Sequence, residues 1–219
     1  KQIYDPPISL YIRGNKEILN EKSIAIVGCR DATTYGKKAA KYFAYNLAKE
    51  GFNIISGLAR GIDSYSHIGC IVADREEKDK IRNITNVTNS NINVKSNIGK
   101  TIAVLGNGLD TIYPTENKYL AQEIIKKGGA IISEYPLGTK PEKMNFPARN
   151  RIVSGLAKGL IVVEAKEKSG TLITVDFALE QGKDVYVVPG NINETTSVGT
   201  NELIKQGAKL VSTYMDILE

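Results

Sequence analysis

The sequence predicts an α/β fold with a doubly wound, mostly parallel sheet. Short runs of Val, Ile, Leu and Ala recur along the 219 residues, and five of them stop at a glycine-bearing turn. Continuous apolar runs are typical of strands buried on both faces of a parallel sheet. A segment with helical spacing follows each run, which gives the alternating order of such folds. Because ligands of open sheets bind at the carboxyl ends of the strands, we expect a functional site at that edge.

The predicted elements follow the chain in order. Residues 1–22 form a lead-in strand, from Ile8 to Ile12, and a linker, and the main domain covers residues 23–219. Its strands are expected near residues 24–28, 52–57, 101–106, 129–134, 159–164, 184–189 and 208–212. Its helices are expected near residues 34–50, 62–73, 116–127, 149–158, 171–181 and 200–206.

Local signals support individual helices. Ala39, Phe43 and Leu47 form an apolar stripe at helical spacing before Gly51. Asp63 is expected to cap the helix over residues 62–73, since Asp is a preferred N-cap residue. Residues 74–98 are charged and then rich in Asn, without a sustained apolar face. We therefore expect a solvated insertion there, between a helix and a strand.

Composition limits the classes of function. The 29 Lys and Arg residues outnumber the 24 Asp and Glu residues, for a net charge of +5, which mildly favours a polyanionic partner. Cys29 and Cys70 lie without a CxxC spacing or companion histidines, so we expect reduced thiols, no metal site and a cytoplasmic protein. No apolar run is long enough to cross a membrane. His67, the single histidine, is expected to be structural.

Two nucleotide-binding motifs are incomplete. Gly99-Lys100-Thr101 resembles the end of a Walker A loop, but the required earlier glycine is absent, since position 94 is Val94. The turn at Gly28 lacks the G-x-G-x-x-G spacing, and the second strand ends in Ser56-Gly57 without the acid that holds a ribose. These departures argue against an NTPase and against a nicotinamide or flavin cofactor.

The stretch from Ser56 to Asp63 is the most specific signal for binding. Gly57 and Gly61 flank Arg60 directly after a strand, and Arg30 follows the neighbouring strand. An arginine beside free backbone N–H groups suits a phosphate. The alternative is a tight turn with a surface cation. At Gly170 and Thr171 a helix begins after Ser169, which is either a further anion site or a plain N-cap.

A second segment, residues 143–151, mixes cations with one aromatic ring. Lys143, Phe146, Asn150 and Arg151 fall within it. Single-stranded nucleic acid is commonly held by cations on its backbone and an aromatic ring against a base. The alternative is that Phe146 belongs to the core and that Arg149 and Arg151 lie on a solvated helix face.

The ordered motifs resemble the DNA-processing protein A family, also called DprA or Smf. The resemblance covers about residues 3–219 apart from residues 74–98, and rests on these stretches: Ile24–Arg30, Ser56–Asp63, Thr101–Gly108, Tyr113-Pro114, Ser133–Pro136, Phe146–Arg151, Val163–Ala165, Ser169–Thr174, Ala178–Gly182 and Val187–Gly190.

The resemblance implies an extended Rossmann-like domain that binds single-stranded DNA in a basic pocket. It implies a recombination mediator without catalytic turnover or cofactor, which protects incoming DNA in natural transformation and helps load RecA recombinase. Arg60 and Lys143 would hold phosphates and Phe146 would lie against a base. The pocket wall would comprise Arg30, Gly57, Gly61, Asn150, Arg151, Gly170 and Thr171. Self-association as a homodimer is expected around Asn201 to Val211. Because family members carry further domains, we expect this chain to be a core fragment.

Two other functions stay open. Phosphoribohydrolases of the lysine-decarboxylase-like type use a Pro-Gly-Gly-x-Gly-Thr-x-x-Glu turn. Gly170-Thr171 is similar to its centre, but Thr174 stands at the glutamate position, so the general base would be missing. A non-catalytic nucleotide sensor could use the same sheet edge. Micromolar binding of a mononucleotide without preference for oligomers would favour the sensor.

Overall fold

The computed structural model describes residues 3–88 and 97–218, and one sheet organises them. Its strands are β1 (Tyr11–Gly14), β2 (Ser23–Val27), β3 (Asn53–Ser56), β4 (Thr101–Leu105), β5 (Ala130–Ser133), β6 (Gly159–Val162), β7 (Asp184–Val187) and β8 (Lys209–Leu210). They lie in the order β1-β5-β4-β3-β2-β6-β7-β8, and only β1 is antiparallel to its neighbour. This confirms the predicted doubly wound, mostly parallel α/β sheet.

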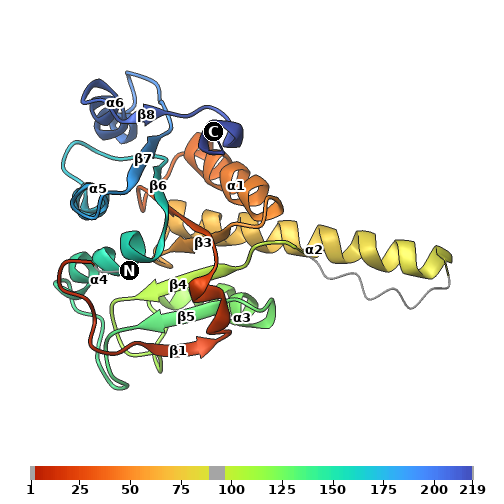
Figure 1. Ribbon diagram of the computed structural model, residues 1–219. Helices are drawn as coiled ribbons and strands as arrows, with labels where there is room; N and C mark the ends of the chain where they lie inside the picture. The colour runs from red at the N-terminus through yellow and green to blue at the C-terminus, as the bar shows by residue number, and fades with distance from the viewer. Residues whose placement is uncertain (1–2, 89–96, 219) are drawn as a thin grey trace.

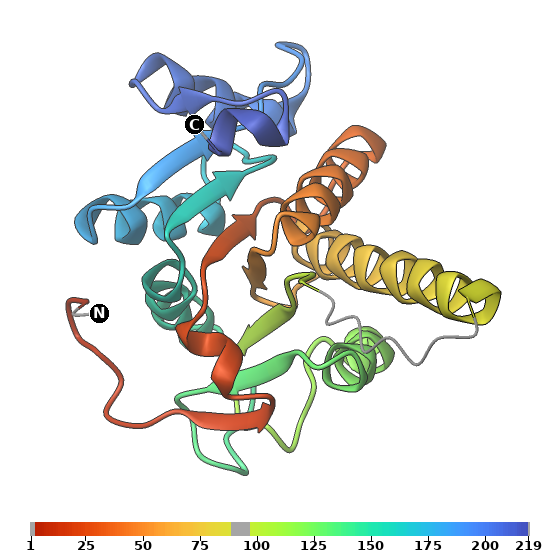
Figure 2. The ribbon, with the colours of Figure 1, turned by 45° about the vertical axis from the view of Figure 1, so that its right-hand side comes forward.

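Helices cover both faces of the sheet. Their bounds are α1 (Thr34–Lys49), α2 (Ile62–Thr88), α3 (Lys118–Lys126), α4 (Asn145–Leu156), α5 (Gly170–Glu180) and α6 (Val198–Lys205). Figures 1 and 2 show α1, α2 and α3 along one face and α4 and α5 along the other. Short 3-10 turns complete the fold at Glu17–Asn20, Thr115–Asn117, Thr195–Ser197 and Tyr214–Ile217.

The apolar core lies in layers on the two faces of the sheet. Ile24 and Ile26 of β2 pack with Phe43 and Leu47 of α1, which confirms the predicted stripe. Alternate residues of the same strand point to the other face, where α4 and α5 contribute Ile152, Val153, Val175 and Ala178. Because side chains alternate along a strand, continuous apolar runs supply both layers.

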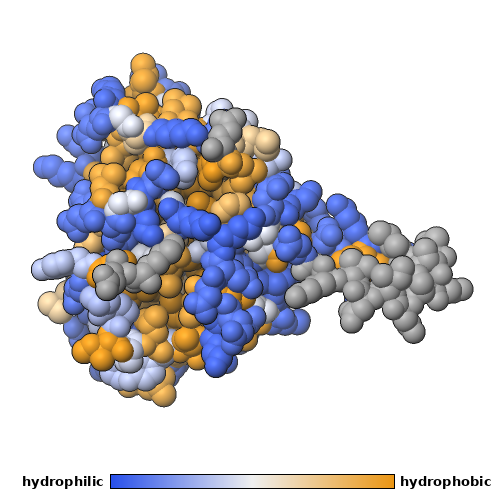
Figure 3. All heavy atoms as spheres, in the orientation of Figure 1, coloured by the Kyte–Doolittle hydropathy of each residue, from blue (hydrophilic) through white to orange (hydrophobic). Residues whose placement is uncertain are grey.

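The sequence-based boundary of the second helix is wrong. The helix expected over residues 62–73 continues to Thr88, so residues 74–88 of the expected insertion are helical. Arg, Glu and Lys are good helix formers, and Asp74 pairs with Lys78 one turn later. Residues such as Arg75 and Lys80 are exposed, and Figure 3 shows hydrophilic side chains along this projecting part of α2. The remainder of the Asn-rich stretch, residues 89–96, lies outside the described residues.

Asp74 corrects the expectation of a solvated segment. Its carboxylate is only 2% exposed and lies within 4 Å of three ammonium groups, at 2.5 Å from Lys100, 2.8 Å from Lys78 and 3.8 Å from Lys127. Burial by itself would raise the carboxyl pKa, but the hydrogen bonds from Lys100 and Lys78 outweigh it and the pKa is lowered. The charged run thus begins as part of the packed structure.

The lead-in strand belongs to the same sheet. It lies at Tyr11–Gly14, slightly later than expected, and pairs antiparallel with β5 at one edge. The turn after it places Ile18 in the core. None of the helices described within residues 3–88 and 97–218 is long and apolar enough to cross a membrane.

Candidate nucleic-acid interface

One pocket lies where the winding direction of the sheet changes. Strand β2 has β3 on one side and β6 on the other, so the loops after β2 and β6 diverge to opposite faces and leave a crevice. An open pocket of about 550 Å³ occupies this position; we call it the rim pocket. Seven of the predicted site residues line it: Arg30, Gly57, Lys143, Phe146, Asn150, Gly170 and Thr171.

Residues 57–61, which we call the glycine turn, are organised by Asp63. Its Oδ2 accepts hydrogen bonds from the backbone N–H groups of Gly57 at 3.1 Å and Ala59 at 3.3 Å. Asp63 lies inside the first turn of α2, so its side chain holds the preceding loop and the prediction of an N-cap is wrong. Burial raises the pKa of Asp63, and the nearby Arg149 opposes that rise.

Arg149 is the residue that sequence reasoning missed. The alternative to nucleic-acid binding placed Arg149 on a solvated helix face, and it was not among the predicted site residues. The structure shows that it is 5% exposed and lines the rim pocket. Its guanidinium donates to the carbonyl groups of Gly57, at 2.8 Å, and Val104. Burial lowers its pKa to about 10, which leaves it protonated at neutral pH. A Cβ on Gly57 would lie 2.5 Å from Nη2, so the glycine makes room for this cation.

Aromatic side chains form one wall of the pocket. The rings of Phe146 and Tyr113 lie 5.6 Å apart between centroids with a 31° tilt, and we call this pair the aromatic platform. The Arg30 guanidinium lies 5.6 Å from the Phe146 centroid. Phe146 is half-buried and lines the pocket, so it is not a core residue in the sense of the alternative reading. The platform offers apolar faces beside a cation.

The opposite wall is the start of α5. Ser169 accepts a hydrogen bond from the N–H of Thr171 at 3.2 Å, as expected for an N-cap. Gly170 is exposed, and Asn150 of α4 donates to its carbonyl at 3.4 Å, which ties the two helices together. The remaining cations on this side, Lys166 and Lys168, also line the pocket. A helix N-terminus flanked by lysines favours an anionic ligand.

Arg60 and Gly61 lie just outside the rim pocket. Arg60 lines a smaller adjoining pocket together with Arg30, Phe146 and Arg149, and it is held by Glu116 in an exposed ion pair. Gly61 has φ +70°, and a Cβ there would lie 2.3 Å from the carbonyl oxygen of Cys29. Its role is therefore to let the glycine turn approach the loop after β2.

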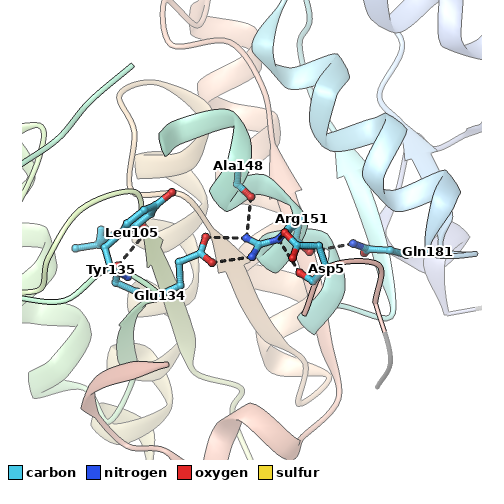
Figure 4. Close-up of polar contacts among 8 residues, drawn as sticks. Asp5, Leu105, Glu134, Tyr135, Ala148, Arg151 and Gln181 are labelled. Carbon is cyan, nitrogen blue, oxygen red and sulfur yellow. Dashed lines mark hydrogen bonds and ion pairs between the residues drawn. The ribbon is translucent and has the colours of Figure 1, made fainter. Parts of the chain in front are cut away.

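Arg151 does not belong to the pocket wall, which corrects the sequence-based expectation. Figure 4 shows it beside Glu134, and its guanidinium forms two hydrogen bonds of 2.7 Å to the carboxylate of Glu134. Its Nε lies 3.2 Å from a carboxylate oxygen of Asp5 and donates to the Asp5 carbonyl. Arg151 is 8% exposed. Its hydrogen bonds to the Glu134 carboxylate raise the pKa of Arg151, and the charge of this arginine neutralises that acid within the structure.

The histidine and the two cysteines of the sequence analysis are buried in the fold, and Glu164 has a structural role. His67 is buried with Nδ1 2.6 Å from the hydroxyl of Thr101, and burial lowers its pKa to about 3. Cys29 and Cys70 are free, buried thiols. Glu164, which follows β6, accepts hydrogen bonds from the N–H and hydroxyl of Thr33 and so fixes the start of α1 beside the pocket. Within residues 3–88 and 97–218, no group of three or more metal-ligating side chains occurs.

Comparison with solved structures extends the fold assignment. DNA processing protein A from Streptococcus pneumoniae superposes with a TM-score of 0.83 at 39% identity, over 99% of this chain and 67% of that chain. A structure from Helicobacter pylori, described by its single-stranded DNA binding mode, gives a TM-score of 0.79 at 32% identity, over 99% of this chain and 87% of that one. A molybdenum cofactor binding protein of Rippkaea orientalis, at 17% identity and a TM-score of 0.53 over 91% of this chain and 94% of that one, shares the fold alone. The extended Rossmann-like fold is thereby confirmed.

Sequence comparison gives the family. DNA processing protein DprA of Bacillus subtilis is 41% identical over 220 residues, which cover 100% of this chain and 66% of that protein. Protein Smf of Escherichia coli is 41% identical over 215 residues, or 98% of this chain and 51% of Smf. The chain thus spans about half to two thirds of the length of these curated relatives. The sequence model of the family described as DNA recombination-mediator protein A matches residues 1–219, and the chain belongs to that family.

Proposed function

We propose that this chain binds single-stranded DNA in the rim pocket as part of a recombination mediator. The observation that carries the proposal is the convergence of Arg30, Lys143, the aromatic platform and the N-terminus of α5 on one open pocket. Cations and backbone N–H groups suit phosphates, while exposed ring faces suit unpaired bases. The described binding mode of the Helicobacter pylori relative supports the same ligand class.

Each predicted residue other than Arg151 has a distinct part in this proposal. Lys143 and Arg60 contact phosphates from either side of the aromatic platform, and Phe146 lies against a base. Arg30 contacts the phosphate nearest the platform. Gly170 presents its backbone N–H at the start of α5, where Ser169 holds the N–H of Thr171, and Asn150 holds that helix end in place. Gly57 leaves room for the Arg149 guanidinium below the glycine turn, and Gly61 lets this turn approach the loop after β2. Bases in a duplex are stacked and paired, so their faces could not reach the platform.

The wider role is that of protecting incoming strands in natural transformation and helping to load RecA recombinase, in the cytoplasm and without catalytic turnover. Its test is the rate of RecA assembly on single strands coated with single-strand-binding protein, with and without this chain. Equal rates would contradict the loading role.

We also propose a homodimer through Asn201 to Val211, because β8 is an edge strand with Leu210 48% exposed. Light scattering on Leu210→Lys, which should be monomeric, tests it.

Binding is tested by titrating oligothymidylates of increasing length at two salt concentrations. Lys143→Gln should weaken binding and lower the slope of log affinity against log salt by roughly 0.7, the value for one phosphate contact on a single strand. Lys140→Gln is the matched control, because Lys140 is exposed nearby on the same loop but outside the pocket lining. Equal effects of the two variants would refute the site.

Two assays with nucleoside monophosphates distinguish the alternative functions from DNA binding. Thymidine monophosphate that saturates the pocket as tightly as the oligomers would favour a nucleotide sensor. Release of free base from nucleoside monophosphates would favour the phosphoribohydrolase reading. The position of its missing glutamate, Thr174, lines the rim pocket and offers a hydroxyl group there, which is a poor general base at neutral pH.

A further inference from the structure

Arg60, one of the arginines proposed to contact phosphate, already holds an anion of the protein itself. Arg60 donates through Nε to one carboxylate oxygen of Glu116 at 2.7 Å and through Nη2 to the other at 2.8 Å. This is the two-point arrangement that arginine also forms with phosphate oxygens. The carboxylate of Glu116 therefore occupies the position that two phosphate oxygens would take.

The contact is built into the fold, because a buried amide joins the two loops. Glu116 lies on the 3-10 turn Thr115–Asn117, and Asn117 is 9% exposed. The Asn117 side chain donates to the carbonyl groups of Leu58 at 2.8 Å and Ala59 at 3.3 Å, within the glycine turn that carries Arg60. The backbone at Glu116 is thus tied to the backbone at Arg60, and only the side chains can separate.

The ion pair also borders the proposed binding surface. Arg60 lines the small pocket with Arg30, Tyr113 and Phe146, so a phosphate bound to Arg60 would lie beside the aromatic platform. A nucleotide whose base stacks on this platform would bring its phosphate to the side where Glu116 lies. One guanidinium edge cannot hold the carboxylate and the phosphate in the same two-point geometry.

On these grounds we propose that Glu116 is a built-in competitor for the DNA phosphate at Arg60 and is a residue that sets the affinity of the site. The proposal rests on the proposed function of the rim pocket. The Arg60 and Glu116 side chains are 61% and 52% exposed, so water screens their attraction and a phosphate can displace the carboxylate. The displaced carboxylate stays close to the bound strand and repels it. The pair keeps the arginine oriented, but makes its contact with DNA readily exchangeable.

The test is Glu116→Gln, which keeps the shape of the side chain and removes its charge. Oligothymidylate should bind about two- to fivefold more tightly, the range expected for removal of one exposed charge contact. Glu180→Gln is the matched control, since Glu180 is also exposed and lies at the end of α5, outside both pockets. The gain should vanish in an Arg60→Gln background, because no guanidinium is then left to compete for.

The outcomes separate the two proposals. If the unmodified chain binds no oligothymidylate, the proposed function fails. If the unmodified chain binds and Glu116→Gln binds equally or more weakly, the competitor role is overturned and Glu116 only orients Arg60. An equal gain in the Arg60→Gln background would also overturn it, because the effect would then be general electrostatic repulsion. Thermal unfolding of each variant checks that the fold is retained.

Discussion

Replacing Arg149 with Met tests whether a buried cation holds the rim pocket together. The guanidinium lies below the glycine turn, bonded to two carbonyl groups, and its charge faces the buried carboxyl of Asp63. Met has a similar length and no charge. The substitution therefore leaves much of the packing volume filled and removes the electrostatic partner, which makes it a selective perturbation of the pair.

The magnitude follows from what remains after the change. Asp63 keeps its hydrogen bonds from the N–H groups of Gly57 and Ala59, but no cation faces it. The energy scale is the loss of about 3–5 kcal/mol that follows when a buried charge is left without its compensating neighbour, because that charge stays desolvated. A domain of this size has a total free energy of unfolding of about 5–15 kcal/mol, so the variant should lose a large part of its stability.

The assay is urea unfolding followed by circular dichroism at several pH values. Burial raises the pKa of Asp63 above its unfolded value, and loss of Arg149 removes the charge that opposes this rise. A carboxyl group whose pKa is raised on folding costs no stability at low pH, where it is protonated in both states. At higher pH, where the group ionises in the unfolded state, it destabilises the folded state. The deficit of Arg149→Met should therefore be largest at neutral and higher pH and shrink as the pH falls toward the unfolded-state value of about 3.9.

Two controls make the result decisive. Adding Asp63→Asn should recover part of the loss, because the uncompensated charge is removed. Lys38→Met, at an exposed position of α1, should change the free energy of unfolding by less than about 0.5 kcal/mol. A deficit below about 1 kcal/mol for Arg149→Met, or one that does not depend on pH, would refute the claim that the Arg149 charge compensates the buried carboxyl of Asp63.

Three further predictions concern other parts of the molecule. Phe146→Ala should weaken oligothymidylate binding by about 5- to 150-fold, the equivalent of one stacked base, and should leave the salt dependence unchanged; a loss below twofold in the titration would contradict stacking. Arg151→Gln should cost about 1.5–3 kcal/mol of stability through its contacts with Glu134, while the folded protein keeps its DNA affinity, unlike Lys143→Gln. The lowered pKa of Asp74 means that its ion pairs stabilise the fold above about pH 4 and lose this effect as the pH falls through the folded-state pKa; Asp74→Asn should unfold more easily at pH 7 and show a shallower acid transition.

The strands could be predicted because each buried strand carries its own signal. Runs such as Ile24 to Val27 and Ile102 to Leu105 are apolar at every position. This pattern is typical of a strand that is covered on both faces, because all of its side chains are then buried. The position of the rim pocket at the carboxyl ends of the strands could then be predicted from the parallel order alone. The glycine turn could be located for the same reason, since it begins where β3 ends.

The end of α2 could not be predicted by the same logic. An apolar stripe identifies a helix that packs along its length, whereas the charged part of α2 projects beyond the sheet, as Figures 1 and 2 show. Its helicity depends on propensity and on local pairs such as Asp74 with Lys78, which are individually weak signals. The three lysines around Asp74 come from α2, from the position just before β4 and from the position just after α3, so no local window contains all of them.

The exchange of roles between Arg149 and Arg151 has a geometric cause. Helix residues that are two positions apart in the sequence lie about 200° apart around the helix axis. One of them therefore faces the rim pocket only if the other faces away. Both are arginines, and composition gives no preference between them. The helix begins at Asn145, because Pro147 fits a first turn where its missing N–H is not needed, and not at Arg149 as expected. With this start, the phase directs Arg149 under the glycine turn and Arg151 toward Glu134. Which arginine serves the site is thus decided by partners distant in the sequence.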